Sequence, residues 1–359
     1  MTSPVILQGV PNSPYTRKML ALLRYRRIPY ELLIGVPEAA GLGTSMGMPA
    51  FRRDGLPAAN VGLAPTFYWP NASGTLTASV DSTPIIRRLE LEHTGRSVLP
   101  SDPVVAFLDY LLEEYADEWL TKSVMHFRWH HAEDIEKAGK ILPLALDTQL
   151  APEAAALFTK MFTKRQTGRL HVVGSNEATK EVIESSYVRF LKLFSAHLEG
   201  SAFLMGGRPG ASDFAVFGQL TQLTQFDPTP MALALEHGPR VFAWVEHAED
   251  LSGAECTKDD WVKRDSIPET LLALLEEMGR VYVPVMLANE HALNEGHDKV
   301  QSVVDGTTWV QDPFPYQRRC LAWARDEYGK LSSSDRTAVD GLLDGTGCEA
   351  LRTQVWLDP

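Results

Sequence analysis

Residues 5–20 of this 359-residue chain are VILQGVPNSPYTRKML, and they decide its fold. The short apolar run predicts a buried strand, which the Gly, Pro, Asn and Ser cluster ends before a segment of helical period begins. Pro14 suits the first helical turn, so Asn12 or Ser13 is the expected N-cap. Because a helix N-terminus offers free N–H donors and partial positive charge, this loop can hold a carboxylate, a phosphate or a thiolate. The plainer alternative is that Ser13 only caps the helix.

The segments that follow predict a thioredoxin-like order of elements. The helix expected over residues 15–27 carries apolar side chains on one side and cations, among them Arg17 and Lys18, on the other. Residues 30–34 alternate like a second strand, which a right-handed crossover makes parallel to the first. Residues 36–62 predict a loose loop that contains one short helix at most. A hairpin and a helix follow, with strands over 63–69 and 75–80 and the helix after Asp81-Ser82.

Composition excludes several classes of protein. The hydrophobic share of 44% and the charged share of 22% are ordinary for a soluble protein of two or three domains. A net charge of −12 argues against nucleic acid or an anionic membrane as the main partner. Cys256, Cys320 and Cys348 are odd in number and far apart, which indicates a reducing compartment and neither a disulfide framework nor a zinc site. With no basic leader and no apolar stretch of about 20 residues, a cytoplasmic location is expected.

Four stretches, in this order, make the chain resemble the cytosolic glutathione S-transferase superfamily. They are Ser13-Pro14-Tyr15 after the first strand, Ala64-Pro65-Thr66-Phe67 at the family's cis-proline strand, Asp81-Ser82 at its acidic-Ser pair, and residues 206–220, which look like the core helix of its helical domain. The resemblance covers about residues 5–250. The family's Ser/Thr cap of that core helix is Gly210 here, with Asp213 at the third helical position. Asp213 is therefore interpreted as a capping and folding residue.

The resemblance implies an α/β thioredoxin-like N-terminal domain and an all-α C-terminal domain. The expected divisions are a glutathione-binding domain over 1–93, a linker over 94–103, the all-α transferase domain over 104–255 and a C-terminal extension over 256–359 that packs on the helical domain. Within the extension, Asp305-Gly306 predicts a hairpin, and Pro284 falls inside a long helix or kinked pair over 268–294. Further helices are expected near 316–328 and 334–343. The extension could cover the substrate cleft, form a dimer surface or bind a partner.

Glutathione, the cosubstrate that the resemblance implies, reacts as a thiolate. An ordinary thiol with a pKa near 8.5 is only partly ionised at neutral pH, and a hydroxyl at a helix N-terminus stabilises the anion by a hydrogen bond and the helix dipole. By resemblance to the serine-type transferases, Ser13 is the expected donor to the sulfur, and the Asn12 amide is the alternative. The absence of Cys at position 13 and of any Cys-x-x-Cys argues against thiol–disulfide exchange.

The resemblance also implies the residues that bind the rest of glutathione and its co-reactant. The backbone of Ala64, with Pro65 in cis, would pair with the cysteinyl unit. Ser82, at a helix N-terminus, would hold the γ-glutamyl carboxylate, and Asp81 would receive the ammonium group. The pocket for a hydrophobic electrophile would be lined by Tyr15, Trp119, His126 and Trp129.

A metal site is not expected. His126 and His130 are four residues apart, a spacing that can bind zinc, but no Glu lies between them and no third ligand is apparent in the sequence. An aromatic core with polar edges is the favoured interpretation of this segment.

Two functions from different classes remain open. The favoured one is a homodimeric glutathione transferase that conjugates hydrophobic electrophiles in detoxification, or a glutathione-dependent reductase or lyase. The alternative is a non-catalytic glutathione transferase-like binding module, since fold does not settle function and both the extension and residues 36–62 are distinctive.

Overall fold

The computed structural model describes residues 3–39, 43–44 and 55–352. Its main sheet has four strands in the order β2-β1-β5-β6. Strand β1 is parallel to β2 and antiparallel to β5, and β6 is antiparallel to β5, as expected of the thioredoxin-like arrangement. The strands are β1 (Val5–Gly9), β2 (Tyr30–Ile34), β5 (Thr66–Pro70) and β6 (Leu76–Ser79).

Two helices pack on this sheet, α1 (Pro14–Tyr25) and α2 (Ser82–Glu92). Of the two predicted N-cap candidates, Ser13 caps α1, because its Oγ accepts a hydrogen bond of 3.3 Å from the Thr16 N–H. Residues 40–42 and 45–54 of the predicted loop over 36–62 lie outside the described residues, and the described part includes a small antiparallel pair, β3 (Glu38–Ala39) and β4 (Gly43–Thr44).

The helical domain is built around α8, whose residues are almost all buried. Asp213 caps this helix, as interpreted from the sequence, by accepting hydrogen bonds from the N–H groups of Gly210 (2.8 Å) and Leu204 (2.9 Å). The domain's helices are α3 (Pro103–Tyr115), a π-helical turn (Ala116–Leu120), α4 (Thr121–His130), α5 (Ala132–Leu146), α6 (Pro152–Thr167), a 3₁₀ turn (Leu170–Val173), α7 (Lys180–His197), α8 (Ala211–Gln225), α9 (Pro228–His237) and α10 (Pro239–Ala248).

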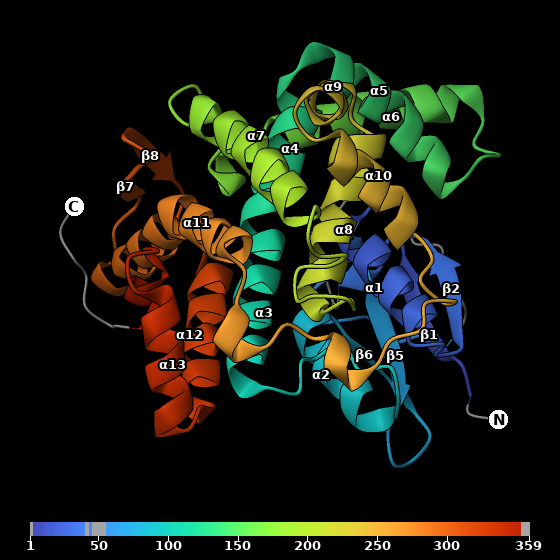
Figure 1. Cartoon of the computed structure of the whole chain (residues 1–359). Helices are drawn as coiled ribbons and strands as arrows, with labels where there is room; N and C mark the ends of the chain where they lie inside the picture. The colour runs from blue at the N-terminus through green and yellow to red at the C-terminus, as the bar shows by residue number, and fades with distance from the viewer. Residues whose placement is uncertain (1–2, 40–42, 45–54, 353–359) are drawn as a thin grey trace.

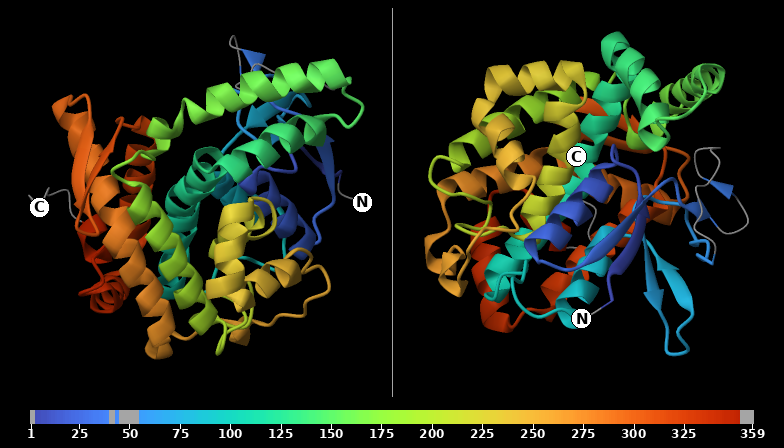
Figure 2. Two further views of the ribbon diagram at one scale, coloured as in Figure 1. Left: turned by 90° about the horizontal axis from the view of Figure 1, so that it is seen from above. Right: turned by 90° about the vertical axis from the view of Figure 1, so that its right-hand side faces the viewer.

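The C-terminal extension packs against α3 and α7, on the side of α3 that faces away from the sheet (Figures 1 and 2). The predicted hairpin is confirmed, with Asp305 and Gly306 at φ 51° and 75° in its turn. The predicted long helix is a single one that contains Pro284. The extension comprises 3₁₀ turns (Lys258–Asp260, Arg264–Ser266, Cys348–Arg352), α11 (Glu269–Glu295), β7 (Val300–Val304), β8 (Thr307–Gln311), α12 (Pro315–Lys330) and α13 (Ser333–Leu343).

One apolar core runs from β1 through the helical domain into the extension, and includes Leu7, Phe214 and Leu275. The extension is therefore integrated with the body of the molecule. Among the helices in the described part of the chain, none is long and apolar enough to cross a membrane.

Candidate functional site

Ser13 lies where the loop after β1 meets the segment before β5. Its Oγ donates a hydrogen bond of 3.1 Å to the carbonyl oxygen of Ala64, and the Ala64–Pro65 peptide bond is cis. The structure thus brings Ser13 to the Ala64-Pro65 pair, which follows it by about fifty positions in the sequence. Both Ser13 and Ala64 are half-buried, so each keeps some exposure to a ligand.

A cavity of about 310 Å³ opens beside Ser13. Asn12, Ser13 and Tyr15 line one side, and residues 62–64 contribute a second. The rest of the wall is mainly apolar and comes from α4, α5 and α6, through Val124, Met125, Trp129, Leu142, Ala145, Leu146, Phe158 and Phe162. A small apolar ligand would therefore find burial in this cavity close to the Ser13 hydroxyl.

Arg128 of α4 brings a guanidinium group to the same cavity. Its Nε and Nη2 donate to both carboxylate oxygens of Asp227 at 2.8–3.0 Å, and Nη2 also donates to Gln222 at 2.8 Å. Its Nη1 lies 3.5 Å from the carbonyl oxygen of Asn12. This fixed, charge-compensated cation therefore supports the loop that carries Ser13. Sequence analysis missed Arg128, whose only signal was a basic residue within an aromatic helix.

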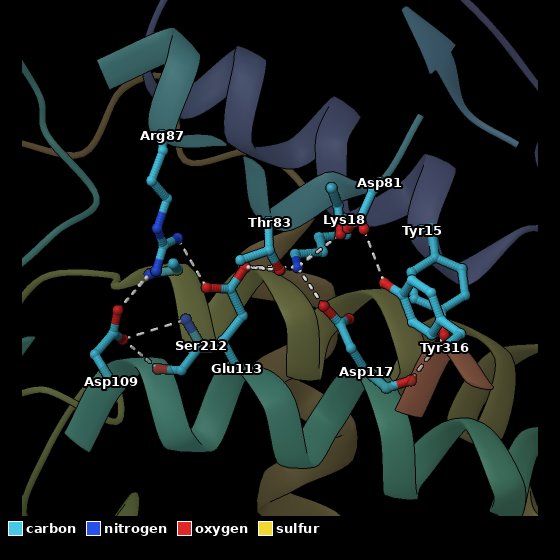
Figure 3. Close-up of polar contacts among 12 residues, drawn as sticks. Tyr15, Lys18, Asp81, Thr83, Arg87, Asp109, Glu113, Asp117, Ser212 and Tyr316 are labelled. Atoms are coloured by element: carbon cyan, nitrogen blue, oxygen red, sulfur yellow. Dashed lines mark hydrogen bonds and ion pairs between the residues drawn. The ribbon is translucent and has the colours of Figure 1, made fainter. Parts of the chain in front are cut away.

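The acidic-Ser pair sits at the start of α2, where Asp81 contacts Tyr316 of α12 (Figure 3). Ser82 is buried, and its Oγ accepts a hydrogen bond of 3.0 Å from Lys18 Nζ. Asp81 has φ 83°, a backbone region that favours glycine, and its Oδ2 accepts a hydrogen bond of 2.9 Å from the hydroxyl of Tyr316 in α12. Burial raises the pKa of Asp81, while the contacts with Tyr316 and Lys18 oppose that rise. Neither Asp81 nor Ser82 lines the cavity beside Ser13.

Lys18 is the hub of this polar cluster, whereas the sequence pattern had placed it on the charged outer side of its helix. Its side chain is 1% exposed, and Nζ donates to Glu113 at 2.9 Å and to Asp117 at 2.6 Å (Figure 3). Glu113 also accepts a hydrogen bond of 3.0 Å from Arg87. Although burial opposes charge at both sites, the carboxylates raise the pKa of Lys18, and the cations lower the pKa of Glu113. A fixed positive charge therefore lies directly behind Ser82.

The four residues expected to line the pocket divide into two pairs. Tyr15 and Trp129 line the cavity, and the Tyr15 hydroxyl donates to the carbonyl oxygen of Asp117 at 2.7 Å. Trp119 lies elsewhere, fully buried with its ring centroid 5.3 Å from that of Trp309. His126 is also fully buried and does not line the cavity. The expectation for Trp119 and His126, which came from the resemblance, is therefore wrong for this cavity, because contacts with other segments bury both side chains away from it.

Comparison with known proteins relates this chain to one family. Its sequence matches the family model for the glutathione S-transferase N-terminal domain over residues 7–97 and the model for the C-terminal domain over residues 177–247. No curated protein sequence matches the chain.

Several solved structures are similar to it. A glutathione S-transferase from Methylobacterium radiotolerans, in complex with glutathione sulfonate, is 18% identical, with a TM-score of 0.40 over 69% of this chain and 91% of the other. A glutathione S-transferase from Ceriporiopsis subvermispora, in complex with glutathione, is 16% identical, with a TM-score of 0.41 over 69% and 99%. A GST-like protein from Pseudomonas syringae is 17% identical, with a TM-score of 0.40 over 69% and 67%.

Proposed function

Since this chain belongs to the glutathione S-transferase superfamily, we propose that it binds glutathione and activates its thiol as a thiolate for attack on a hydrophobic electrophile. The observation that carries this proposal is the place of the Ser13 hydroxyl. It lies at the N-terminus of α1, 3.1 Å from the Ala64 carbonyl and at the edge of an apolar cavity.

Ser13 and Ala64 would exchange hydrogen-bond partners when glutathione binds. The cysteinyl N–H of glutathione would donate to the Ala64 carbonyl, which now accepts from the Ser13 hydroxyl. The released hydroxyl would then donate to the sulfur. Lowering a thiol pKa by about two units corresponds to about 2.7 kcal/mol, which a charge-assisted hydrogen bond together with the helix dipole can supply. The sulfur lone pair then forms the C–S bond to an electrophile held in the cavity, and the leaving group departs with its electron pair.

The γ-glutamyl end is assigned to Asp81 and Ser82. The N–H groups at the N-terminus of α2 favour a carboxylate at Ser82, whose Oγ is held by Lys18, while the charge of Lys18 is already paired with Glu113 and Asp117. Oδ1 of Asp81 is the atom proposed to receive the ammonium group, since Oδ2 accepts from Tyr316. Conjugation is the proposed reaction, ahead of glutathione-dependent reduction or cleavage, in a cytoplasmic homodimer with a role in detoxification.

The proposal is tested by retention on immobilised glutathione, by the ultraviolet difference absorbance of the bound thiolate, and by turnover of an aryl halide. Ser13→Ala should still be retained but lose the thiolate signal and turnover. Since the variant also loses an N-cap worth about 1 kcal/mol, Ser332→Ala is the matched control: it removes the serine cap of α13, away from the cavity, and should keep all three properties. If Asn12→Ala loses the thiolate while Ser13→Ala keeps it, the sulfur donor is Asn12.

One observation favours the non-catalytic alternative, because the acidic-Ser pair already has partners in Tyr316 and Lys18. Tyr316→Phe removes the hydroxyl that donates to Asp81 and leaves the ring in place. Measurable glutathione binding in the wild type, altered in Tyr316→Phe, supports the glutathione site. An absence of retention and of thiolate in both proteins would sink the enzyme proposal and leave the binding module.

A further inference from the structure

Three potential metal-ligating groups converge at the C-terminal end of α4. They are His126 near the end of that helix, His131 just after it, and Glu184 of α7. Nε2 of His126 lies 3.0 Å from Oε1 of Glu184, and Nε2 of His131 lies 3.1 Å from the same oxygen. All three ligand atoms lie within 4.8 Å of one another. One carboxylate oxygen therefore faces two imidazole nitrogens.

These separations come close to those of a tetrahedral metal centre. With metal–nitrogen and metal–oxygen bonds of about 2.1 Å, adjacent ligand atoms lie about 3.4 Å apart. The observed nitrogen–oxygen distances of 3.0 and 3.1 Å thus need to open by only a few tenths of an ångström. The two imidazole nitrogens, which lie within 4.8 Å of each other, must also take this spacing, and side-chain exposures of 30% and 36% leave His131 and Glu184 room to rotate.

The surroundings of His126 orient its ring. Nδ1 of His126 lies 2.8 Å from Oγ of Ser175, so a hydrogen bond on that side directs Nε2 toward Glu184. Metal-bound histidines are commonly held in this way through their second ring nitrogen.

The structure brings His126 together with His131, whereas the spacing in the sequence suggested His126 and His130. His130 is stacked on His126, with ring centroids 4.7 Å apart and an interplanar angle of 21°, so the two rings lie face to face and do not point at a common centre. His131 is the first residue after α4 and has extended backbone angles, φ −86° and ψ 137°. This break in the helix turns its ring toward Glu184, the third ligand that was not apparent in the sequence.

We propose that His126, His131 and Glu184 form a binding site for a divalent transition metal ion of the zinc class. Two imidazoles and one carboxylate suit zinc and its neighbours cobalt and nickel. The exposed edge at His131 and Glu184 leaves the remaining coordination position to water. The ion would join the end of α4 to α7. None of the three residues lines the cavity beside Ser13, so the site is independent of glutathione chemistry.

The test uses the full chain without affinity-tag histidines, stripped with a chelator and titrated with zinc chloride by calorimetry. We expect one zinc ion per chain, and an affinity at least tenfold weaker in both Glu184→Gln and His131→Ala. Ser175→Ala should weaken binding by about 10–100-fold, since it frees the ring of His126. Because His126→Ala empties a buried position, the isosteric Glu184→Gln carries the test. His171→Ala, which removes an exposed histidine, is the matched control and should bind like the wild type.

Cobalt chloride gives a second readout, because Co(II) bound in a tetrahedral site has intense visible d–d absorption bands. These bands should appear in the wild type and in His171→Ala, and disappear in Glu184→Gln. The competing explanation is a metal-free hydrogen-bonded cluster in which the imidazole N–H groups donate to Glu184. Failure of zinc to bind, or unchanged affinity in both Glu184→Gln and His131→Ala, would establish that explanation and overturn the metal site.

Discussion

Replacing Lys18 by Met should destabilise the folded protein by about 3–5 kcal/mol. Lys18 is 1% exposed and donates to Glu113 and Asp117 at 2.9 and 2.6 Å, so the variant leaves two buried carboxylates without their shared cation. Removing one partner of a buried ion pair costs this much because the remaining charge stays desolvated. Arg87 still contacts Glu113, which places the expected value toward the lower end of the range.

Urea denaturation at pH 7, followed by tryptophan fluorescence and circular dichroism, measures the change in the free energy of unfolding. Lys140→Met is the matched control: Lys140 is 67% exposed and pairs with Glu136 one helical turn away, so its loss should cost about 0.5 kcal/mol or less. The double variant Lys18→Met/Asp117→Asn should recover at least about 1 kcal/mol, because it neutralises one of the two stranded carboxylates.

The dependence on pH gives an independent check. In the wild type the pKa of Glu113 is lowered to about 2, so its contribution to stability is complete above the unfolded pKa of about 4.5 and is lost as the pH falls toward 2. The difference in the free energy of unfolding between the wild type and Lys18→Met should therefore become smaller as the pH falls below about 4.5. The assignment of Lys18 as the buried cation shared by Glu113 and Asp117 would be refuted by two results together. The free energy of unfolding of Lys18→Met would lie within about 1 kcal/mol of the wild-type value at pH 7, and the difference would not change at low pH.

Two further predictions concern packing and titration. A Cβ on Gly218 of α8 would lie 2.4 Å from the Pro14 carbonyl oxygen of α1, so Gly218→Ala should lower the free energy of unfolding in urea by about 1–3 kcal/mol. Gly341→Ala, in a helix with open space around that position, should leave it unchanged or raise it by up to about 1 kcal/mol. Equal effects of the two substitutions would contradict the close packing of α1 and α8. Glu114 is 4% exposed, and its burial and the charges of Glu118 and Asp117 raise its pKa. Above a pH of about 4.5 the unfolded chain has lost the Glu114 proton and the folded protein still holds it, so the free energy of unfolding falls as the pH rises. Against Glu114→Gln, the wild type should lose up to about 1.4 kcal/mol per pH unit between pH 6 and 8; parallel curves would contradict the raised pKa.

Sequence patterns predicted the features that local chemistry dictates. The cap at Ser13, one of two candidates, and the turn at Asp305-Gly306 each depend on a few neighbouring residues, and both are confirmed. The parallel pairing of β1 with β2 follows from a single helical crossover and is also confirmed. The cap at Gly210 and Asp213 is likewise a short-range arrangement. The two-domain architecture was predicted from the order of several motifs, which resembles that of the glutathione S-transferases, and no single motif would have indicated it.

The features that sequence patterns did not predict depend on contacts between segments that are far apart in the chain. Lys18 has the helical position of a surface cation, and only contacts with segments distant in sequence bury it beside Glu113 and Asp117. Arg128 likewise gains its role from Asp227, ninety-nine positions away. Trp119, which the resemblance placed in the pocket, is instead fully buried against Trp309, a residue far along the chain.

The extension shares its polar contacts with the predicted glutathione site, which bears on the three roles left open for it. At the start of α12, Tyr316 donates to Asp81, and the next residue, Gln317, donates to Glu118 at 3.2 Å. In the hairpin, Trp309 covers Trp119. Removing the extension would therefore uncover a buried acidic cluster and part of the core. A truncated protein would lose stability and glutathione binding together, whatever the role of the extension.

Single hydroxyl deletions separate these effects where truncation cannot. If the extension helps to form the γ-glutamyl end of the site, Tyr316→Phe should change glutathione binding while the free energy of unfolding falls by only about 1 kcal/mol, the usual value of one hydrogen bond. A structural role alone would lower stability by the same amount and leave the dissociation constant for glutathione unchanged. Because Tyr316 reaches Asp81 and, among the described residues, those lining the cavity lie between Val10 and Gln166, the geometry favours a role at the glutathione end over one as a roof for the electrophile.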